Sequence, residues 1–342
     1  MMKLVASAMI LLTIIFTPIL SFAEKIGRQY MIQGKTMGTY YSLKIVSKKA
    51  LDISVWQSKV NTQLKELNKK LSMYDPDSEL SAFNRHPVQS LMQISQDFFT
   101  ILSASRTMYH LSNGAWDGTV KPIVDLWGFG SKKKNREVPK AVKINMALSM
   151  VGFYNITLPG QHIALKRKNV TLDLGSIAKG YGVDAIARLF LSSNIRNILI
   201  EIGGELFASG VNQNGKIWRV GILQPEKTCL KNRLYKIVQL EDRAIATSGS
   251  YRNYFEKNGE IYSHIIDPKT GYPVKNQIVS ASVISKDCTY ADGLATALMV
   301  MDLNKGLSLI NALEDTECLI IQKKKDAFVS HLSKNFSRYV VD

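Results

Sequence analysis

Three short phrases between residues 244 and 300 constrain this chain more tightly than any other part of it. They read AIATSGSYRNYF, SHIIDPKTGYPV and ADGLATALMV. The first two combine small residues, hydroxyl side chains and an Asp-Pro turn, a composition typical of a ligand-binding loop. The third has apolar residues at helical spacing, which predicts a helix with Asp292 and Thr296 four residues apart on one face. A carboxylate and a hydroxyl would then point the same way.

The remaining chain mixes strand-like hairpins with isolated helical periods. This mixture predicts an α+β fold with mixed or antiparallel sheets flanked by helices, rather than a doubly wound sheet. The residues expected to share the buried face of the first helix are Trp56, Val60, Leu64, Leu67 and Leu71. The expected helices cover residues 51–71, 96–112 and 181–191, with a short one after Ser78. Strands are expected within residues 30–46, where MGTYYSLKIV is entered through a turn at Met37, Gly38 and Thr39, and over residues 170–174 and 197–202.

Residues 1–23 differ in composition from the rest of the chain. A lysine precedes a nearly uninterrupted apolar run over residues 4–16, and Ala23 provides a small residue at the end. The pattern predicts a cleaved secretory signal, an exported, periplasmic protein and one mature domain over residues 24–342. An uncleaved anchor is the alternative, but the apolar run is shorter than the ~20 residues of a membrane-spanning helix. No cysteine follows the run, so lipid attachment at the new N-terminus is not expected.

The formal net charge of +16 raises the question of a nucleic-acid partner. The lysines and arginines are scattered apart from clusters at residues 131–136 and 323–325, and no basic helix carries interleaved aromatic residues. We therefore expect no nucleic acid, but a solvated surface attracted to an anionic membrane. The three cysteines, Cys229, Cys288 and Cys318, show no metal-site spacing and can form at most one disulfide.

Carboxylates and hydroxyls beside glycine turns indicate a site for a hard cation. Asp117, Asp173 and Asp292, with Ser176 and Thr296, offer the oxygen ligands that Mg²⁺ prefers, particularly alongside phosphate oxygens. The glycine turn that follows Asp173, between a strand and a helix, suits an anion such as phosphate. No GxSxG or Walker motif occurs, so the sequence favours neither a serine hydrolase nor a P-loop enzyme.

Two assignments stay open on the residues alone. His264 lies between a serine and an Asp-Pro turn, and it could accept a proton from a hydroxyl nucleophile or be a satisfied structural histidine. Trp116 and Trp127 could pack in the core or lie against a flat ligand.

Eight phrases follow one another along the chain: KTMGTYY, LSMYDPDSELSAFN, GAWDGTVKPIVDLWGFG, LDLGSIAKGYGVD, EIGGELFASG, AIATSGSYRNYF, SHIIDPKTGYPV and ADGLATALMV. In this order and at these distances, over residues 34–300, the chain resembles the ApbE family of FAD:protein FMN transferases. The resemblance implies an ApbE-like (T-fold-like) architecture and an exported, Mg²⁺-dependent enzyme. Such an enzyme splits FAD, passes FMN to a threonine hydroxyl of a target protein as a phosphoester and releases AMP.

The resemblance also implies roles for individual positions. Ser176, through its backbone oxygen, Asp292 and Thr296 are expected to bind Mg²⁺, and His264 or Asp292 to deprotonate the incoming threonine, with His264 favoured. Some members carry a second aspartate where this chain has Ala295, so a water or a backbone oxygen is expected to complete the metal shell. The positions expected to contact FAD are Met37, Tyr74, Ala115, Trp116, Asp117, Asp173, Lys179 and Ile266.

The implied acceptors are subunits of membrane-bound, flavin-carrying redox complexes of the Rnf and Nqr kind, which would bring the basic surface near anionic lipid. Two other functions stay open. One is a Mg²⁺-dependent FAD pyrophosphatase, in which water replaces the protein hydroxyl. The other is a non-catalytic exported FAD-binding protein, against which the joint presence of Asp292, Thr296 and His264 argues.

Overall fold

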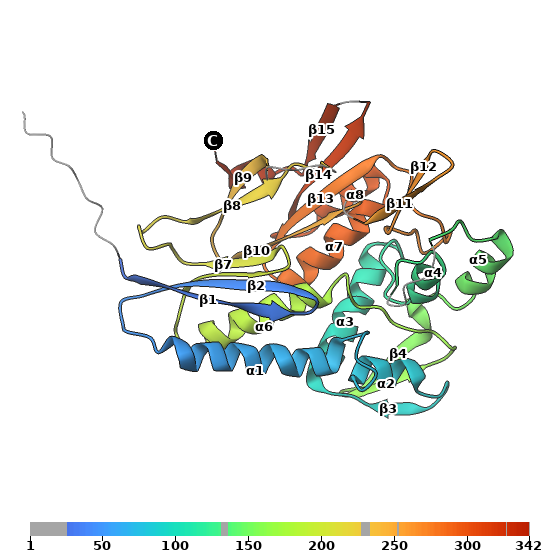
Figure 1. The fold of residues 1–342 in the computed structure, drawn as a ribbon, viewed down its shortest axis with the longest axis horizontal. Helices are drawn as coiled ribbons and strands as arrows, with labels where there is room; N and C mark the ends of the chain where they lie inside the picture. The colour runs from blue at the N-terminus through green and yellow to red at the C-terminus, as the bar shows by residue number, and fades with distance from the viewer. Residues whose placement is uncertain (1–25, 131–135, 227–232, 252, 326, 342) are drawn as a thin grey trace, which may run out of the picture.

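An eight-stranded sheet forms the centre of the computed structural model, in the order β1-β2-β6-β7-β10-β13-β14-β15, and every neighbouring pair is antiparallel (Figure 1). The structure describes residues 26–130, 136–226, 233–251, 253–325 and 327–341, so the expected signal segment at residues 1–23 and Cys229 lie outside the described residues. The strands of this sheet are β1 (Arg28–Thr36), β2 (Thr39–Ser47), β6 (Asn197–Ile202), β7 (Glu205–Ser209), β10 (Arg243–Gly249), β13 (Ile278–Ser285), β14 (Glu317–Lys324) and β15 (Ala327–Leu332).

Helices and smaller antiparallel sheets surround the large sheet, which confirms the predicted α+β fold. In the part of the chain that the structure describes, no helix combines the length and the apolar composition needed to cross a membrane. The helices are α1 (Ile53–Leu71), α2 (Glu79–Arg85), α3 (Gln96–Leu111), α4 (Lys121–Leu126), α5 (Ala141–Leu148), α6 (Ala178–Leu191), α7 (Cys288–Val300) and α8 (Leu303–Ala312). The small sheets are β3 (Leu91–Gln93) with β5 (Ile163–Lys166) and β4 (Ile156–Gly160); β11 (Tyr254–Lys257) with β12 (Glu260–Ser263); and β16 (Val340–Val341) with β9 (Leu234–Leu240) and β8 (Trp218–Leu223).

The two faces of the large sheet bury different partners because side chains alternate along each strand. On β10, Ala244 and Ala246 pack with the helical side, while Ile245 packs with side chains of β8 and β9 on the other face. Helices α1, α6 and α7 cover the first face, and α7 lies directly against β10 and β13 (Figure 1). Cys288 of α7 and Cys318 of β14 are free thiols buried in this arrangement.

Helix α1 confirms the predicted apolar stripe. Asp52 caps its N-terminus by accepting hydrogen bonds from the N–H groups of Ser54 and Val55 at 3.0 and 3.3 Å. Trp56 stacks on Phe190 of α6 with ring centroids 4.7 Å apart. Burying each large side chain of the stripe contributes roughly 1.5–3 kcal/mol, so the stripe alone fixes α1 against the sheet and α6. The buried residues of α1 are Trp56, Val60, Leu64, Leu67 and Leu71.

Residues 170–174 do not form the predicted strand. The side chain of Asn84 supplies their partners instead: its Oδ1 accepts from the N–H of Leu172 at 2.7 Å, and its Nδ2 donates to the Leu172 carbonyl at 2.9 Å. The N–H of Asp173 donates to the Gly118 carbonyl at 2.7 Å. Because a side chain and a loop satisfy these backbone groups, the segment needs no neighbouring strand.

The expected turn at Met37, Gly38 and Thr39 is present, with positive φ at Met37 and Gly38 (49° and 71°), and the strand that it opens is confirmed as β2. The residues before the turn form a strand of their own, β1, which pairs with β2 as a hairpin. One loop prediction was wrong. The phrase AIATSG is not a binding loop but strand β10, at the centre of the sheet. Its small residues let α7 pack closely against the strand, which is a core role that small residues also fill.

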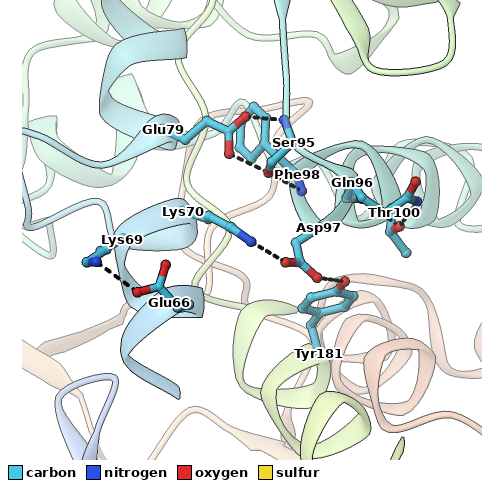
Figure 2. A network of polar contacts seen from close by, with 10 residues as sticks. All are labelled: Glu66, Lys69, Lys70, Glu79, Ser95, Gln96, Asp97, Phe98, Thr100 and Tyr181. Carbon is cyan, nitrogen blue, oxygen red and sulfur yellow. Dashed lines mark hydrogen bonds and ion pairs between the residues drawn. The ribbon is translucent and has the colours of Figure 1, made fainter. Parts of the chain in front are cut away.

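A polar network joins α1, α3 and α6 (Figure 2). Asp97, in the first turn of α3, accepts hydrogen bonds from Lys70 Nζ of α1 and from the Tyr181 hydroxyl of α6, each at 2.6 Å. Burial raises the pKa of Asp97, but these two hydrogen bonds, together with the positive charges of Lys70 and Arg188, hold the pKa below its ordinary value. Glu79 of α2 accepts from the N–H and the hydroxyl of Ser95, the residue that caps α3. The network therefore fixes where α1 ends relative to the start of α6.

We expect Asp97→Asn to destabilise the protein by about 1–3 kcal/mol, because the amide cannot accept from both donors as the carboxylate does. Urea unfolding at neutral pH measures the loss. Glu66→Gln is the matched control, since it breaks an exposed pair with Lys69 of 2.8 Å in the same region (Figure 2) and should leave stability essentially unchanged. Equal losses in the two variants would contradict a structural role for the network.

Candidate active site

A cavity of about 730 Å³ lies where the N-terminus of α6, the middle of α7, the end of β10 and the β1–β2 turn meet. Every residue that the sequence singled out for the site lines this cavity, although the stretches that carry them are far apart along the chain. These residues are Met37, Tyr74, Ala115, Trp116, Asp117, Asp173, Ser176, Lys179, His264, Ile266, Asp292 and Thr296.

Helices α6 and α7 approach closely because Gly180 has no side chain. A Cβ at this position would lie 2.3 Å from the carbonyl oxygen of Cys288 and 2.9 Å from the Cβ of Asp292. The approach lets the N–H of Gly180 donate to Oδ2 of Asp292 at 3.0 Å. One turn further along α6, Asp184 accepts from the N–H groups of Cys288 and Thr289, each at 2.8 Å, and so caps α7. The carboxylate of Asp292 is thereby fixed in the cavity wall.

Lys179 lies between two buried carboxylates. Its Nζ is 3.2 Å from Oε1 of Glu205 and 3.7 Å from Oδ2 of Asp292. Burial by itself would lower the pKa of Lys179, but Asp292 and Glu205 outweigh it and raise that pKa. Burial, and then the neighbouring Asp292 carboxylate, raise the pKa of Glu205, whereas the positive charge of Lys179 and the hydrogen bond from it lower this pKa and favour the carboxylate. This wall suits a ligand that brings charge of both signs, as a divalent cation with phosphate groups does.

Hydroxyl and carboxylate oxygens converge on the same wall. Thr296 follows Asp292 by one turn of α7, and its Oγ1 lies 3.0 Å from the hydroxyl oxygen of Ser248 on β10. The hydroxyl of Ser176 accepts from Trp116 Nε1 at 3.0 Å, which fixes the turn that carries the Ser176 backbone oxygen. The candidate metal ligands in this wall are all oxygen atoms and therefore fit Mg²⁺ better than zinc. They include one carboxylate, and among the described residues no three or more His, Cys, Asp or Glu side chains are grouped around a metal position.

Asp117 and Asp173 line the cavity, but their carboxylates bind the backbone around them. Oδ1 of Asp117 accepts from the N–H and the hydroxyl of Thr119 at 2.8 and 2.6 Å, and Oδ2 accepts from the N–H of Phe153 at 3.1 Å. Oδ1 of Asp173 accepts from the N–H of Gly175 at 2.8 Å. Burial raises the pKa of both carboxyl groups. Both oxygens of Asp117 are thus engaged in shaping the loop, which places them poorly for binding a cation.

Apolar and aromatic groups form another part of the wall. The thioether of Met37 packs against α6 at Gly182, where a Cβ would lie 3.1 Å from Met37 Cε. Tyr74 is 73% exposed, so its ring is open to a flat ligand. The open question about the tryptophans resolves toward packing: Trp116 is 2% exposed and Trp127 is 0% exposed. Trp116 nevertheless reaches the cavity wall, whereas Trp127 donates to the Gly271 carbonyl in a separate cluster.

A main-chain carbonyl orients His264. Its Nδ1 lies 3.0 Å from the carbonyl oxygen of Asn253, and because a carbonyl can only accept, Nδ1 carries the proton of the neutral ring. Nε2 then keeps its lone pair. Burial lowers the pKa of His264, and the positive charge of Arg136 lowers it further. The imidazole is therefore neutral at neutral pH and able to accept a proton.

Comparison with known proteins decides which family has this site. The sequence model of the ApbE family matches residues 37–320. The chain belongs to the ApbE family. It is 38% identical over 323 residues to the FAD:protein FMN transferase of Vibrio cholerae, covering 94% of this chain and 96% of that relative. It is 33% identical over 315 residues to the FAD:protein FMN transferase of Escherichia coli, and the alignment covers 91% of this chain and 89% of that relative.

Solved structures of the ApbE family have the same fold. The flavin transferase ApbE from Vibrio cholerae superposes with a TM-score of 0.83 at 37% identity, covering 91% of this chain and 99% of that one. The apo form of the flavinyl transferase ApbE of Pseudomonas stutzeri superposes with a TM-score of 0.83 at 34% identity, covering 91% of this chain and 96% of that one. The resemblance predicted from the eight phrases is therefore confirmed, and so is the ApbE-like fold.

Some cavity residues had no predicted role although they lie in the ApbE-like phrases. Glu205 begins the largely apolar strand β7, and a charge at such a position could have indicated a site. Ser248 was missed because AIATSG was interpreted as a loop. In a strand, alternate side chains point to the same face, and this alternation directs Ser248 toward Thr296 of α7. Asn253 acts on His264 through its main-chain carbonyl, so its side chain gives no signal in the sequence.

We expect Gly180→Ala to force α6 and α7 apart, because the added Cβ would meet the Cys288 carbonyl oxygen at 2.3 Å. Overpacking of this kind costs about 1–3 kcal/mol and should lower the melting temperature. Gly160→Ala is the matched control, since the nearest atom to its Cβ, Ile163 Cδ1, is 3.8 Å away. A Gly180→Ala protein as stable as this control would show that the helices tolerate a wider separation.

Proposed function

We propose that this ApbE-family protein is an FAD:protein FMN transferase that moves FMN from FAD to a threonine hydroxyl of an acceptor protein and releases AMP. The observation that carries the proposal is the meeting of Asp292, Thr296 and His264 in one cavity of about 730 Å³. A protein that only stores flavin needs a pocket, but it does not need a buried carboxylate, a hydroxyl and a neutral histidine together. Relatives named FAD:protein FMN transferase, aligned over 94% of the chain in one case, support the same function.

Asp292, Thr296 and the backbone oxygen of Ser176 would hold Mg²⁺, since they offer hard oxygen donors in one wall of the cavity. When bound, the ion supplies positive charge that neutralises the pyrophosphate of FAD and favours departure of AMP. Ala295 adds no side-chain ligand on α7, so a water or a backbone oxygen would complete the metal shell.

The other cavity residues bind and orient FAD. Lys179 presents a charged ammonium group beside Asp292 to the phosphates, whereas the N–H groups of Gly175, Ile177 and Ala178 in the turn before α6 already donate to Asp173 Oδ1 and to the Leu174 carbonyl. The exposed ring of Tyr74 and the thioether of Met37 suit the flat ring systems of the substrate. Holding the reacting groups in one geometry supplies much of the rate acceleration for this kind of transfer.

In the transfer step, the threonine oxygen forms a bond to the phosphorus of the FMN phosphate. The bond from that phosphorus to the bridging oxygen breaks, and AMP leaves with the electron pair. Nε2 of His264 takes the hydroxyl proton, because Nδ1 already donates to the Asn253 carbonyl. The acceptor hydroxyl must therefore enter the cavity on the His264 side, in line with the departing AMP.

The same proposal includes a location and partners. The protein acts outside the cytoplasm, in the periplasm, after removal of residues 1–23. Its acceptors are subunits of membrane redox complexes of the Rnf or Nqr kind. The net charge of +16 supports work near an anionic membrane surface.

Intact-mass spectrometry of a candidate acceptor domain tests the function. Incubation with residues 24–342 of this protein, FAD and Mg²⁺ should add the mass of one FMN phosphoester, and EDTA should abolish the gain. Asp292→Ala should also abolish it while FAD still binds, as followed by flavin fluorescence, because the variant removes the carboxylate of the metal donor set. Full transfer by Asp292→Ala would contradict the metal assignment.

The same assay separates the two alternative functions. Accumulation of AMP and free FMN beside an unmodified acceptor would indicate the FAD pyrophosphatase. Intact FAD under all conditions would indicate the flavin-binding protein.

We expect the transfer rate to depend on His264 in its neutral form. Burial lowers the pKa of His264 below 6.5, so the base stays deprotonated into mildly acidic solution, and the rate should fall only below pH 6.5. Single-turnover rates measured from about pH 5 to about pH 9 test this. His264→Gln should lower the rate by about 10²–10⁴-fold and remove the acid limb. His331→Gln, on β15 beside Gln322, is the matched control and should keep the wild-type profile.

A further inference from the structure

The ammonium group of Lys179 lies near two carboxylates and is closer to one of them than to the other. Its Nζ lies 3.2 Å from Oε1 of Glu205 and 3.7 Å from Oδ2 of Asp292. Oδ2 of Asp292 is also the atom that accepts from the N–H of Gly180. The ammonium group is therefore held slightly away from the carboxylate that the proposed function assigns to Mg²⁺.

Glu205 has few other interactions that could explain its position. It is 4% exposed, at the start of β7. Within the described part of the chain, Lys179 is its only ion-pair partner and its Oε2 has no hydrogen-bond partner. The tight turn before β7 packs on the pair: a Cβ at Gly203 would lie 3.2 Å from Lys179 Cδ and 3.4 Å from Oε2 of Glu205. A buried carboxylate that is costly to desolvate is thus directed at a single lysine.

We propose that Glu205 is a positioning residue that holds the Lys179 ammonium group away from Asp292 and so keeps the Asp292 carboxylate available to a divalent cation. This inference rests on the proposed function, because it needs a cation at Asp292. It adds a residue to which neither the sequence nor the transfer step gives a role.

The electrostatic reason is competition for one carboxylate. Without the negative charge of Glu205, the nearest carboxylate to Lys179 Nζ is that of Asp292, 3.7 Å away. Attraction would close this gap, because opposite charges in a buried site interact strongly. A divalent cation would then have to displace the ammonium group and remain beside it, with like charges close together. Glu205 removes both obstacles by giving Lys179 a carboxylate of its own.

Binding of Mn²⁺, followed by the electron paramagnetic resonance signal of the free ion, tests the inference without relying on catalysis. Glu205→Gln keeps the size of the side chain and removes its charge. It should weaken Mn²⁺ binding about tenfold or more, with and without FAD, and raise the half-saturating Mg²⁺ concentration in the transfer assay by a similar factor. Glu201→Gln is the matched control, because Glu201 is an exposed carboxylate on the adjoining strand β6, and it should bind Mn²⁺ as the wild type does.

The double variant Lys179→Met/Glu205→Gln distinguishes positioning from direct contact. If Glu205 acts through Lys179, removing the lysine as well should restore Mn²⁺ affinity to within about threefold of wild type. Unchanged affinity in Glu205→Gln would overturn the inference. Weak binding in both variants would also overturn it, because Glu205 would then reach the cation itself. Absence of Mn²⁺ binding in the wild-type protein would instead refute the metal part of the proposed function.

Discussion

The close contact between α6 and α7 is the interaction on which the site depends. It exists because Gly180 leaves room for the backbone of Cys288. Asp184 then accepts two N–H groups and a hydroxyl from the first turn of α7, which fixes where that helix starts. β10 and β13 support α7 from the sheet side. Held on both sides, α7 cannot rotate freely, so Asp292 and Thr296 keep one direction and can act as a prepared site rather than an adaptable one.

The sequence correctly predicted the helices and strands whose formation depends on the periodicity of nearby apolar residues. The stripe of α1 and the strand β6 follow from apolar periodicity and were predicted correctly. The failures have non-local causes. Residues 170–174 look like a strand, but the side chain of Asn84 takes the place of a neighbouring strand. AIATSG looks like a loop because of its small residues, yet those residues serve the packing of α7 on the sheet, and no local pattern reports that contact.

For the candidate site, the sequence predicted which residues would meet but not how they are oriented. The helical spacing of Asp292 and Thr296 was sufficient to place them together on one face of α7. Asp117 directs its two carboxylate oxygens toward Thr119 and Phe153 because two loops meet in the folded protein. The spacing of residues along the sequence does not show this contact. The tautomer of His264 depends in the same way on the Asn253 carbonyl. Directions of side chains require the tertiary structure, whereas identities of cavity residues can be carried by motifs.

The two buried thiols have a consequence for the proposed location of the enzyme in the periplasm, an oxidising compartment. Burial raises the pKa of Cys318 to about 12, and burial together with nearby carboxylates holds the pKa of Cys288 well above its ordinary value. Oxidants and disulfides react with the thiolate, which these two groups scarcely form in the folded chain. Both cysteines can therefore stay reduced without a reducing partner for as long as the core is intact. Oxidation of either thiol would therefore identify molecules whose core had already unfolded, so the fraction of oxidised thiol reports how many molecules have unfolded.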